Sequence, residues 1–405
     1  MESYGVFDRV PAAGGVRERL MVAARAAHGH GDSGMTHAWL FTGPPGSGRS
    51  VAAEAFAAAL LCENSEQPGC GMCHGCQTAL AGTHSDLFTV RTEGTIIQVK
   101  SVRFRVIPWA YRKPSTAAWR VVIIEDADRL NDQSANALLK AVEEPPERTA
   151  FLMCAPTTNP ADFSVTLRSR SRHVYVPTPT PEDVSEVLRA QFPELADEQA
   201  QWAATVSNGH IGRARGLATD PGTREWRKKA LDMVEAVFNP AVSYLRTFEI
   251  AASAKAEAER RLQSREEEEL SKLEEALGIG ARGKGAQTAL RGTKGDIKRL
   301  EEDQKRRRQR TERDLIDLAL VDVMGLFRDA MVVSVGAASG ATPLIHIDRG
   351  QTAAEIARRV PQEGILECLD AVTDTRNQLG TAVTSRVLLD GLMGQLQLSC
   401  RVGVR

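Results

Sequence analysis

The sequence predicts an α/β protein in which a parallel-sheet domain is followed by a long all-α region. A short apolar run, His37–Thr42, leads through a glycine-rich turn into the alanine-rich stretch Val51–Leu61, which has high helix propensity. A second run of β-branched residues, Val121–Ile124, indicates another buried strand and ends in two acids. Beyond about residue 220 the pattern is helical, with segments such as DLIDLALVDVMGLFRDAMVV and SRVLLDGLMGQLQL.

The overall composition limits the class of protein. With 405 residues, a formal net charge of −1 and 42% hydrophobic residues, the chain is typical of a soluble protein of two or three domains. Its first residues lack the apolar core of a signal peptide and no run is long enough to span a membrane, so we expect a cytoplasmic protein with no membrane partner. The near-neutral charge argues against nucleic-acid binding over the whole surface, so any basic contact must be local.

The stretch GPPGSGRS matches the phosphate-binding loop G-x-x-x-x-G-K-S/T except that Arg49 stands in the lysine position. The glycines allow a tight turn, whose N–H groups, together with the dipole of the following helix, favour a bound anion. Lysine is a compact ammonium, whereas arginine is a longer planar fork that would fit the narrow cradle poorly. A glycine turn that matches by chance is the alternative. The candidate nucleotide-binding residues here are Gly43, Gly46, Gly48, Arg49 and Ser50.

The acids at the end of the second strand are the next part of the candidate nucleotide site. Carboxylates in this position, beside a phosphate loop, hold Mg²⁺ and orient the attacking water. Here Glu125 precedes Asp126, whereas the usual order is Asp then Glu, and the exchange alters the reach of each side chain by one methylene. The alternative is a buried strand followed by a polar turn, without catalysis.

Four of the seven cysteines lie close together in CENSEQPGCGMCHGC, namely Cys62, Cys70, Cys73 and Cys76. In a reducing cytosol this spacing predicts a tetrahedral structural zinc site, with a redox role for the C-x-x-C steps as the competing interpretation. His74 is a possible substitute ligand. Cys154, Cys368 and Cys400 are isolated in the sequence, and we expect them to be ordinary buried residues.

The segment after the second strand carries a family resemblance. NALLKAVEEPP, Asn136–Pro146, followed by FLMCAPTT and LRSRSR, resembles the clamp-loader branch of the AAA+ ATPases. Cysteines inserted after the phosphate-loop helix are typical of its bacterial members, and the missing lysine is typical of the delta-prime class, here with an actinobacterial-like collar insertion. The resemblance implies a RecA-like AAA+ domain at 1–177 with a zinc module at 62–76, a helical lid at 178–220 and a helical collar at 221–405.

Within that family, an arginine in a Ser-Arg-Cys motif reaches the ATP site of the neighbouring subunit. This chain has Ser169-Arg170-Ser171, so the resemblance implies that Arg170 is an arginine finger acting in trans. Arg168 is a less favoured choice for this role. Alternatively, Arg168, Arg170 and Arg172 form a solvated basic face.

Two further departures from the family bear on catalysis. Ala12 and Ala13 stand where hydrolysing relatives carry an adenine-contacting Gly-Gln pair. Gly212 stands in the place of a sensor arginine, with Arg213 one position later, although a one-residue gap would restore the alignment. Together with Arg49 and the order of the acids, these changes predict a site that does not hydrolyse ATP, so any ATP and Mg²⁺ would be bound passively.

The resemblance therefore implies a stator subunit of a pentameric clamp loader. Its partners would be gamma/tau-like ATPase subunits and the delta subunit, and the complex would load a sliding clamp on primed DNA. The chain shows no polymerase active site, although it would be a subunit of a DNA-directed DNA polymerase holoenzyme. One rival is a catalytically active gamma/tau-like ATPase in which Arg49 replaces lysine. The other is a binding module whose zinc knuckle and basic hairpin grip nucleic acid directly.

That hairpin is predicted at about 252–312, as an insertion in the collar. Apolar residues at mostly three- and four-residue steps from Ala251 to Leu277 are typical of an exposed amphipathic helix, and a second charged segment follows. Between them Gly278–Gly295 contains six glycines and four cationic residues without an acid, which predicts a mobile basic tip. The candidate DNA contacts are Arg282, Lys284, Arg291 and Lys294. A flexible, solvated linker is the alternative.

Overall fold

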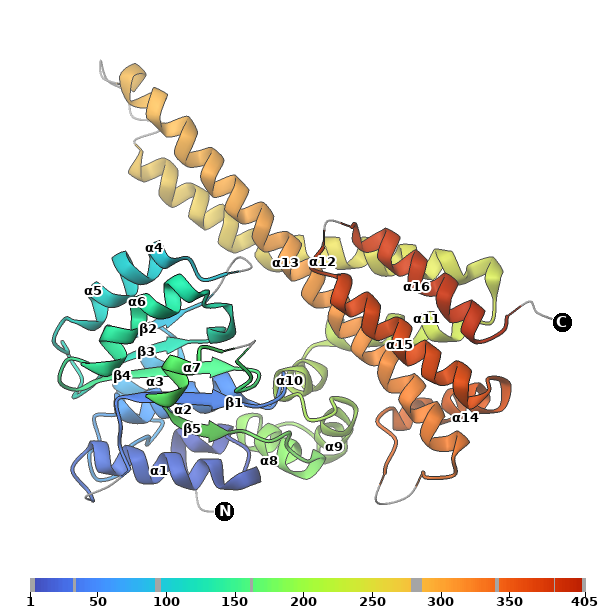
Figure 1. The fold of residues 1–405 in the computed structure, drawn as a ribbon, viewed down its shortest axis with the longest axis horizontal. Helices are drawn as coiled ribbons and strands as arrows, with labels where there is room; N and C mark the ends of the chain where they lie inside the picture. The colour runs from blue at the N-terminus through green and yellow to red at the C-terminus, as the bar shows by residue number, and fades with distance from the viewer. Residues whose placement is uncertain are drawn as a thin grey trace. The chain divides into compact units, whose positions relative to one another are not determined.

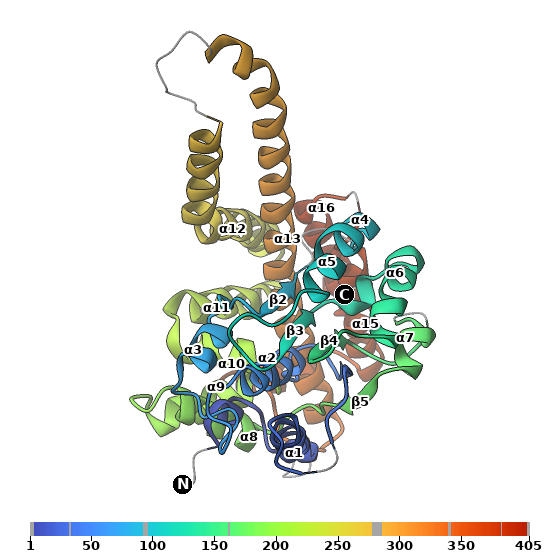
Figure 2. The same ribbon diagram turned by 90° about the vertical axis from the view of Figure 1, so that its left-hand side faces the viewer.

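The computed structural model describes residues 4–31, 34–91, 96–160, 163–277, 286–338, 342–381 and 383–402. Side chains are described for these residues except 276 and 286–294. The chain divides into two units, Met1–Asp220 and Pro221–Arg405 (Figure 1; a second view is Figure 2).

The first unit contains a five-stranded parallel sheet with the strand order β2-β3-β4-β1-β5. The strands are β1 Ala38–Thr42, β2 Leu87–Val90, β3 Arg120–Ile124, β4 Thr149–Ala155 and β5 Arg172–Tyr175. β1, β3 and β4 are buried along their whole length, which explains their continuous apolar sequences. Because the strands are parallel and β4 lies between β1 and β3, the carboxyl ends of these three strands meet at one edge of the sheet.

Alternate side chains of each strand face two opposite helical layers. Trp39 and Phe41 pack into one core, and Ala38 and Leu40 pack into the other. The first layer contains α1 Val16–Ala27, α2 Arg49–Leu60 and α3 His74–Leu80. The second contains α4 Val99–Ser101, the π-helix η3 Val102–Val106, α5 Ile107–Ala110, α6 Asp132–Glu143 and α7 Val165–Ser169.

Three short helices follow the sheet and form their own small core. They are α8 Pro181–Gln191, α9 Asp197–Val206 and α10 Ile211–Thr219. The start of α8 follows from the Thr-Pro-Glu-Asp sequence: the Thr180 hydroxyl accepts from the N–H of Asp183, and the Asp183 carboxylate accepts from the N–H of Thr180. This capping box confirms the helix N-terminus predicted there.

The second unit is entirely helical in the part that the structure describes. Its helices are α11 Pro221–Ala236, α12 Pro240–Ala276, α13 Ala286–Ser334, α14 Gly350–Arg359, α15 Gln362–Gln378 and α16 Ser385–Ser399, with the short 3₁₀ helix η5 Ile347–Arg349 before α14. Its core includes Leu231 from α11, Phe327 from α13 and Leu392 from α16. α12 and α13 run side by side as a hairpin (Figures 1 and 2).

The hairpin that the sequence predicts is present, and its arms are continuous with α12 and α13, because both helices run unbroken from the core outwards. α13 begins at Ala286, inside the stretch Gly278–Gly295. A glycine inside a helix costs only about 1 kcal/mol, so helix propagation from the core can include Gly292 and Gly295.

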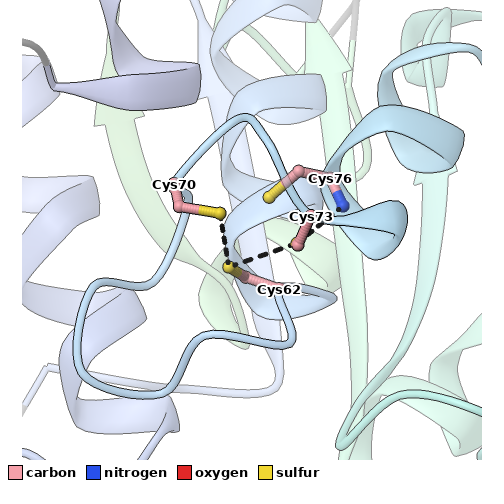
Figure 3. Close-up of side chains that lie close together, drawn as sticks. All are labelled: Cys62, Cys70, Cys73 and Cys76. Carbon is pink, nitrogen blue, oxygen red and sulfur yellow. Dashed lines mark hydrogen bonds between the residues drawn. The ribbon is translucent and has the colours of Figure 1, made fainter.

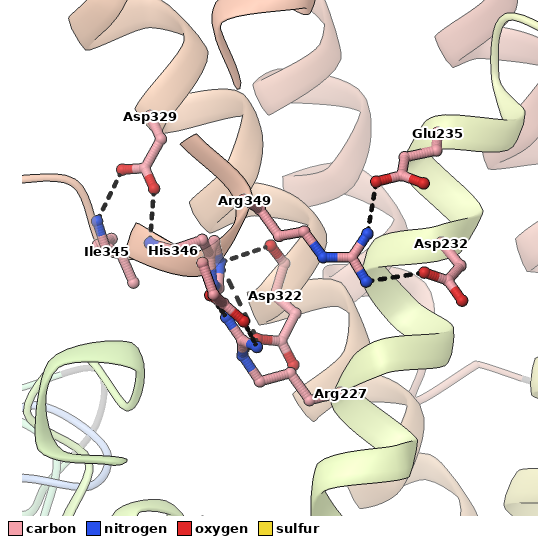
Figure 4. A network of polar contacts seen from close by, with 9 residues as sticks. Arg227, Asp232, Glu235, Asp322, Asp329, Ile345, His346 and Arg349 are labelled. Atoms are coloured by element: carbon pink, nitrogen blue, oxygen red, sulfur yellow. Dashed lines mark hydrogen bonds and ion pairs between the residues drawn. The ribbon is translucent and has the colours of Figure 1, made fainter. Parts of the chain in front are cut away.

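A buried polar network fixes the chain before α14 against α11 and α13 (Figure 4). Arg227 makes two bonds of 2.7 Å to the Asp348 carboxylate and a third of 2.9 Å to His346 Nδ1. Because His346 Nε2 lies 3.1 Å from the carbonyl oxygen of Asp322, which can only accept, Nε2 carries the proton and Nδ1 accepts from Arg227. Asp329 accepts from the main-chain N–H groups of Ile345 and His346. The network therefore ties three segments of the unit together.

These features confirm the predicted fold class: a parallel-sheet α/β domain that gathers four cysteines, a small helical lid, and an all-α region with a helical hairpin. No helix within the described ranges has both the length and the apolar character needed to cross a bilayer.

Candidate functional site

The phosphate loop lies between the carboxyl end of β1 and the start of α2, as its sequence predicts. Gly46 and Gly48 have φ angles of 85° and 98°, which glycine adopts without strain. Gly48 is the N-cap of α2, so the helix begins at Arg49 rather than at the predicted Val51, and Ser50 lies in its first turn. The Ser47 hydroxyl is buried and has no hydrogen-bond partner among the described residues. The loop thus keeps the backbone form of an anion-binding turn.

The side chain in the lysine position turns back onto its own loop. Arg49 Nη1 donates to the carbonyl oxygen of Gly43 at 2.7 Å. Burial lowers the pKa of Arg49, although nearby Asp126 and Asp128 favour its charged form. The guanidinium is therefore a partly buried cation held inside the loop.

The lid closes over the same loop. The N–H of Ile211 donates to the carbonyl oxygen of Gly46 at 3.1 Å, and His210 caps the start of α10 by accepting from the N–H of Arg213. A Cβ at Gly46 would lie 2.3 Å from the His210 ring, and one at Gly48 would lie 2.6 Å from Ile211 Cδ1. Burial, with the charges of Arg213 and Arg49, lowers the pKa of His210, so a neutral imidazole covers the loop.

Glu125 and Asp126 follow β3 at the edge of the sheet where the phosphate loop lies. Glu125 is already paired there, because its Oε1 accepts from Arg91 Nε at 2.8 Å. Burial raises the pKa of Glu125, and the bond from Arg91 opposes that rise. Arg91 also lies 3.5 Å from Glu54 of α2, so one guanidinium joins the acid to the phosphate-loop helix.

The sensor position and the adenine position can also be located. Gly212 lies in the first turn of α10. It has no side chain, and a Cβ at this position would lie 3.5 Å from Cε1 of the His210 ring. Arg213, the next residue, is 8% exposed and belongs to the buried side of α10. Ala13 begins the short 3₁₀ helix η2 Ala13–Gly15, directly after Ala12.

The four clustered cysteines come together where the chain leaves α2 and enters α3 (Figure 3). Their sulfur atoms all lie within 4.8 Å of one another, and Cys62 Sγ is 3.7 Å from both Cys70 Sγ and Cys73 Sγ. Zinc–sulfur bonds of about 2.3 Å in a tetrahedron place the sulfurs about 3.8 Å apart, so this geometry fits the metal. The cluster could therefore hold a metal ion, as predicted, and His74 begins α3 without being part of it.

The electrostatics of the cluster favour a cation. Hydrogen bonding from Cys76 lowers the pKa of Cys62 to about 4, and the same contact, with burial, raises the pKa of Cys76. The thiols thus oppose one another's ionisation, and a bound divalent ion would let all four deprotonate. Cys154 is buried in β4 as expected.

Cys368 and Cys400 are buried as predicted but are not isolated. Their sulfur atoms lie 3.7 Å apart, between α15 and the end of α16. The pair cannot be recognised from the sequence, because 31 residues separate the two cysteines and they meet only when the two helices pack together.

Arg170 is partly exposed at the end of α7. Its Nε lies 2.6 Å from Glu143 Oε1, and its Nη1 donates to the carbonyl oxygen of Thr166 at 3.0 Å. The two neighbouring arginines point elsewhere: Arg168 donates to the carbonyl oxygen of Thr158, and Arg172 lies over the ring of Trp39. Of the three arginines, Arg170 is therefore the one that forms an ion pair with a surface carboxylate, that of Glu143.

The hairpin-tip candidates are not placed. Arg282 and Lys284 lie outside the described residues, and Arg291 and Lys294 lie in α13 where only the backbone is described.

A basic surface near α4 and α5 was missed by the sequence reasoning. Exposed Phe104 and Tyr111 lie among exposed cationic side chains. The cations are Lys100, Arg103, Arg105, Arg112 and Lys113. The sequence did indicate this surface, since no acid occurs between Glu93 and Glu125.

The contacts of Arg91 with Glu125 and of His210 with the phosphate loop had no such indication in the sequence, because each joins residues that are far apart along the chain.

Comparison with known proteins finds similarity to subunits of DNA polymerase III. A family model described as DNA polymerase III, delta subunit matches residues 26–180. DNA polymerase III subunit delta' of Pseudomonas aeruginosa is 32% identical over 210 residues, covering 51% of this chain and 63% of that protein. The Escherichia coli subunit delta' is 34% identical over 203 residues, covering 49% and 58%. The first unit is delta-prime-like.

The likeness is confined to part of each protein. The matched region spans less than two thirds of either delta' relative. DNA polymerase III subunit tau of Bacillus subtilis is 34% identical over 139 residues, covering 33% of this chain and 23% of that protein. Among solved structures, a DNA polymerase III gamma subunit-related protein of Thermotoga maritima covers 95% of this chain and all of its own, at 13% identity and a TM-score of 0.40. The delta-prime-like assignment therefore rests on the sequence matches.

Proposed function

We propose that this chain is the delta-prime-type subunit of a DNA polymerase III clamp loader and that it does not hydrolyse ATP itself. The observation that carries the proposal is the closed phosphate loop, in which Ile211 donates to Gly46 and Arg49 donates to Gly43. ATP hydrolysis needs an open cradle and acids placed to hold Mg²⁺ and orient water, whereas here the order of the two acids is reversed and Glu125 is paired with Arg91. The buried Ser47 hydroxyl and the glycine backbone would suit a phosphate. The features that oppose ATP hydrolysis are therefore the closed access to the loop and the paired acid, and not the backbone of the loop.

The chain's contribution to catalysis would be Arg170, acting on the ATP of a neighbouring subunit. In support, its guanidinium lies at the surface and its partner Glu143 is about as exposed, with 36% and 43% of the two side chains accessible. Surface ion pairs contribute only about 0.2–1 kcal/mol, so Glu143 can orient Arg170 and still release it to a phosphate. A trans arginine can accelerate phosphoryl transfer by about 10³–10⁵.

The assembly would be a pentamer with gamma/tau-like ATPase subunits and delta, which opens a sliding clamp and places it on primed DNA. The relatives named delta' and tau support membership of this set. This chain would be the rigid stator, since no turnover of its own drives a conformational cycle.

Two assays test the proposal. We expect the purified chain to show no Mg²⁺-dependent ATP turnover, and stoichiometric nucleotide binding to be absent or weak. In a complex reconstituted with gamma/tau-type and delta subunits, Arg170→Ala should lower ATPase by about tenfold or more. Arg168→Ala, which changes a neighbouring exposed arginine that donates to the carbonyl oxygen of Thr158, is the matched control. Turnover by the chain alone, lost in Arg49→Ala and Glu125→Ala, would instead make it an active ATPase subunit.

The cysteine cluster would hold structural zinc. Four thiolates close the coordination sphere, so no open position remains for catalysis. The ion would fix the loop between α2 and α3, where Cys62 follows one helix and Cys73 caps the next.

Contact with primer-template DNA would involve the basic surface around α4 and α5. Exposed Phe104 between Arg103 and Arg105 combines a stacking surface with phosphate-binding charge. Arg103→Ala/Arg105→Ala should weaken DNA binding by the complex and reduce the dependence of log K on log salt by about 2, whereas Arg358→Ala/Arg359→Ala should not. Binding that survives the first change but is lost when residues 278–295 are deleted would favour the hairpin tip.

A further inference from the structure

The second unit contains two thiols that the proposed function does not use. Cys368 lies in α15, Cys400 is the C-cap of α16, and their sulfur atoms are 3.7 Å apart. Cys368 is fully buried, and Cys400 is 5% exposed. The cysteine cluster of the first unit includes neither of them. The two residues therefore form a separate thiol pair, which the packing of α15 against α16 brings together.

The separation of the two sulfur atoms suits a disulfide. In a disulfide the sulfurs lie about 2.05 Å apart, so this pair has to close by about 1.7 Å. A cysteine sulfur moves by about 0.9 Å when its χ1 angle turns by about 30°, which a side chain tolerates at small cost. Rotation of both side chains towards each other is therefore enough to bring the sulfurs to bonding distance, without a shift of one helix against the other.

The end of α16 holds Cys400 in a turn that opens easily. The N–H of Arg401 donates to the carbonyl oxygen of Leu398. The N–H of Val402 donates to the carbonyl oxygen of Gln397, which completes a Schellman turn. The turn gives Arg401 a φ of 54°, a left-handed conformation in which arginine is strained relative to glycine. Because helix ends also fray at little cost, opening of this one turn exposes the Cys400 sulfur.

A cavity of about 300 Å³ lies beside the pair, between α15 and α16. Its wall includes Glu367 and Ser399, which directly precede Cys368 and Cys400 in the chain. A water molecule takes up about 30 Å³ in the liquid, so the cavity has room for an oxidant as small as hydrogen peroxide. A small hydroperoxide in this cavity would meet the Cys400 sulfur when the last turn of α16 opens.

We propose that this pair is a site of reversible oxidation, at which a hydroperoxide oxidises Cys400 and Cys368 then closes a disulfide. In the first step the Cys400 sulfur gives up its proton and attacks one oxygen of the hydroperoxide. The O–O bond breaks, Cys400 becomes a sulfenic acid, and with hydrogen peroxide the leaving hydroxide takes the proton and departs as water. In the second step the Cys368 sulfur attacks the Cys400 sulfur, and the displaced hydroxide takes the Cys368 proton as a second water. The two thiols together lose two electrons, and the peroxide is reduced by them.

The order of the two steps follows from burial. Cys400 lies at a helix end, whereas Cys368 lies inside α15 and is closed to solvent. Contact with the Cys400 sulfur, together with burial, raises the pKa of Cys368, so Cys368 keeps its proton while the pair is reduced. The product ties the end of α16 to α15 and should protect both from local opening. This inference is independent of the proposed clamp-loader role.

Peptide mapping of the full chain tests the proposal. Trypsin releases Cys368 in residues 360–376 and Cys400 in residues 387–401, and each peptide contains one cysteine. After treatment with hydrogen peroxide and blocking of the remaining thiols, we expect these peptides to be joined, with the mass of their sum less two hydrogens. A thiol reductant should separate them again. Amide exchange at the end of α16 should be slower in the oxidised chain than in the reduced chain.

Substitutions test the pairing and the order. Cys368→Ser and Cys400→Ser should each abolish the joined peptide, whereas Cys154→Ser, which changes another fully buried cysteine, should leave it unchanged. In Cys368→Ser a reagent specific for sulfenic acid should label Cys400. In Cys400→Ser the same reagent should leave Cys368 unlabelled. Thermal melts of the reduced variants check that they fold, and the measurement on the parent chain does not depend on them.

Three results would overturn the proposal. The first is a parent chain whose two peptides stay separate after oxidation. The second is a Cys400 that ends as sulfinic acid or is joined to a cysteine other than Cys368. The third is sulfenic-acid labelling of Cys368 in Cys400→Ser, which would contradict the order of the steps.

Discussion

Arg91 Nε donates to Glu125 Oε1 at 2.8 Å, and this ion pair engages the first of the two acids that follow β3. We expect that Arg49→Lys/Arg91→Ala, which supplies the missing lysine and releases Glu125, leaves ATP turnover at background. The reason is that His210 and Ile211 still close the loop. Phosphate release from the purified variant with Mg²⁺ measures this, with a gamma/tau-type subunit as the positive control. ATP turnover near that of the control would contradict this expectation, because it would show that closure of the loop by His210 and Ile211 does not prevent hydrolysis.

Asp86 should give the first unit a stability that depends on pH. Burial opposes its ionisation, but the N–H groups of Thr116, Ala117 and Ser115 and the Ser115 hydroxyl outweigh burial and lower its pKa to about 2. A pKa below the unfolded value of about 4 means that ionised Asp86 stabilises the fold above about pH 4, and that this is lost as the pH falls through about 2.

Asp86→Asn should therefore lower the free energy of unfolding by about 2–3 kcal/mol at pH 7. The difference in free energy of unfolding between the variant and the parent should decrease as the pH falls from 4 to 2. Urea unfolding at each pH measures it. Asp197→Asn, whose side chain is 83% exposed, is the control and should change stability by less than about 0.5 kcal/mol. A gap that is independent of pH would contradict the assignment.

Removal of zinc should destabilise the first unit. The purified chain should carry about one zinc ion, and Cys76→Ser should lose it and leave the other three thiols of the cluster reactive. Cys154→Ser, which changes a buried cysteine outside the cluster, should keep the ion. Metal analysis and thiol titration test this. A metal-free parent with four reactive clustered thiols under reducing conditions would rule out the zinc site.

Arg227 should be a principal polar support of the second unit. Its side chain is buried and joins α11 to Asp348 and His346, so Arg227→Ala would leave a carboxylate without its partner. We expect a loss of about 3 kcal/mol or more, with faster amide exchange in α11 and α14. Lys228→Ala removes a surface pair with Asp232, and we expect it to leave stability nearly unchanged. Equal effects of the two changes would contradict this view.

Local patterns were readable from the sequence. The glycines of the phosphate loop, the four cysteines and the capping box at Thr180 depend on spacings of a few residues, and the structure has each in the expected conformation. The hairpin was foreseen in outline, but its arms belong to the collar helices, because helix propagation from a packed core does not stop at a change of composition.

The sequence by itself determined the α/β class, the degenerate phosphate loop and the cysteine cluster, because backbone preference and short spacing set these. Only the tertiary structure decided that Ile211 and His210 close the loop, that Arg91 holds Glu125 and that Cys368 meets Cys400. Each of these contacts joins residues that are more than thirty positions apart. Which of many distant groups becomes the neighbour is settled by strand order and helix packing, and no local pattern records it.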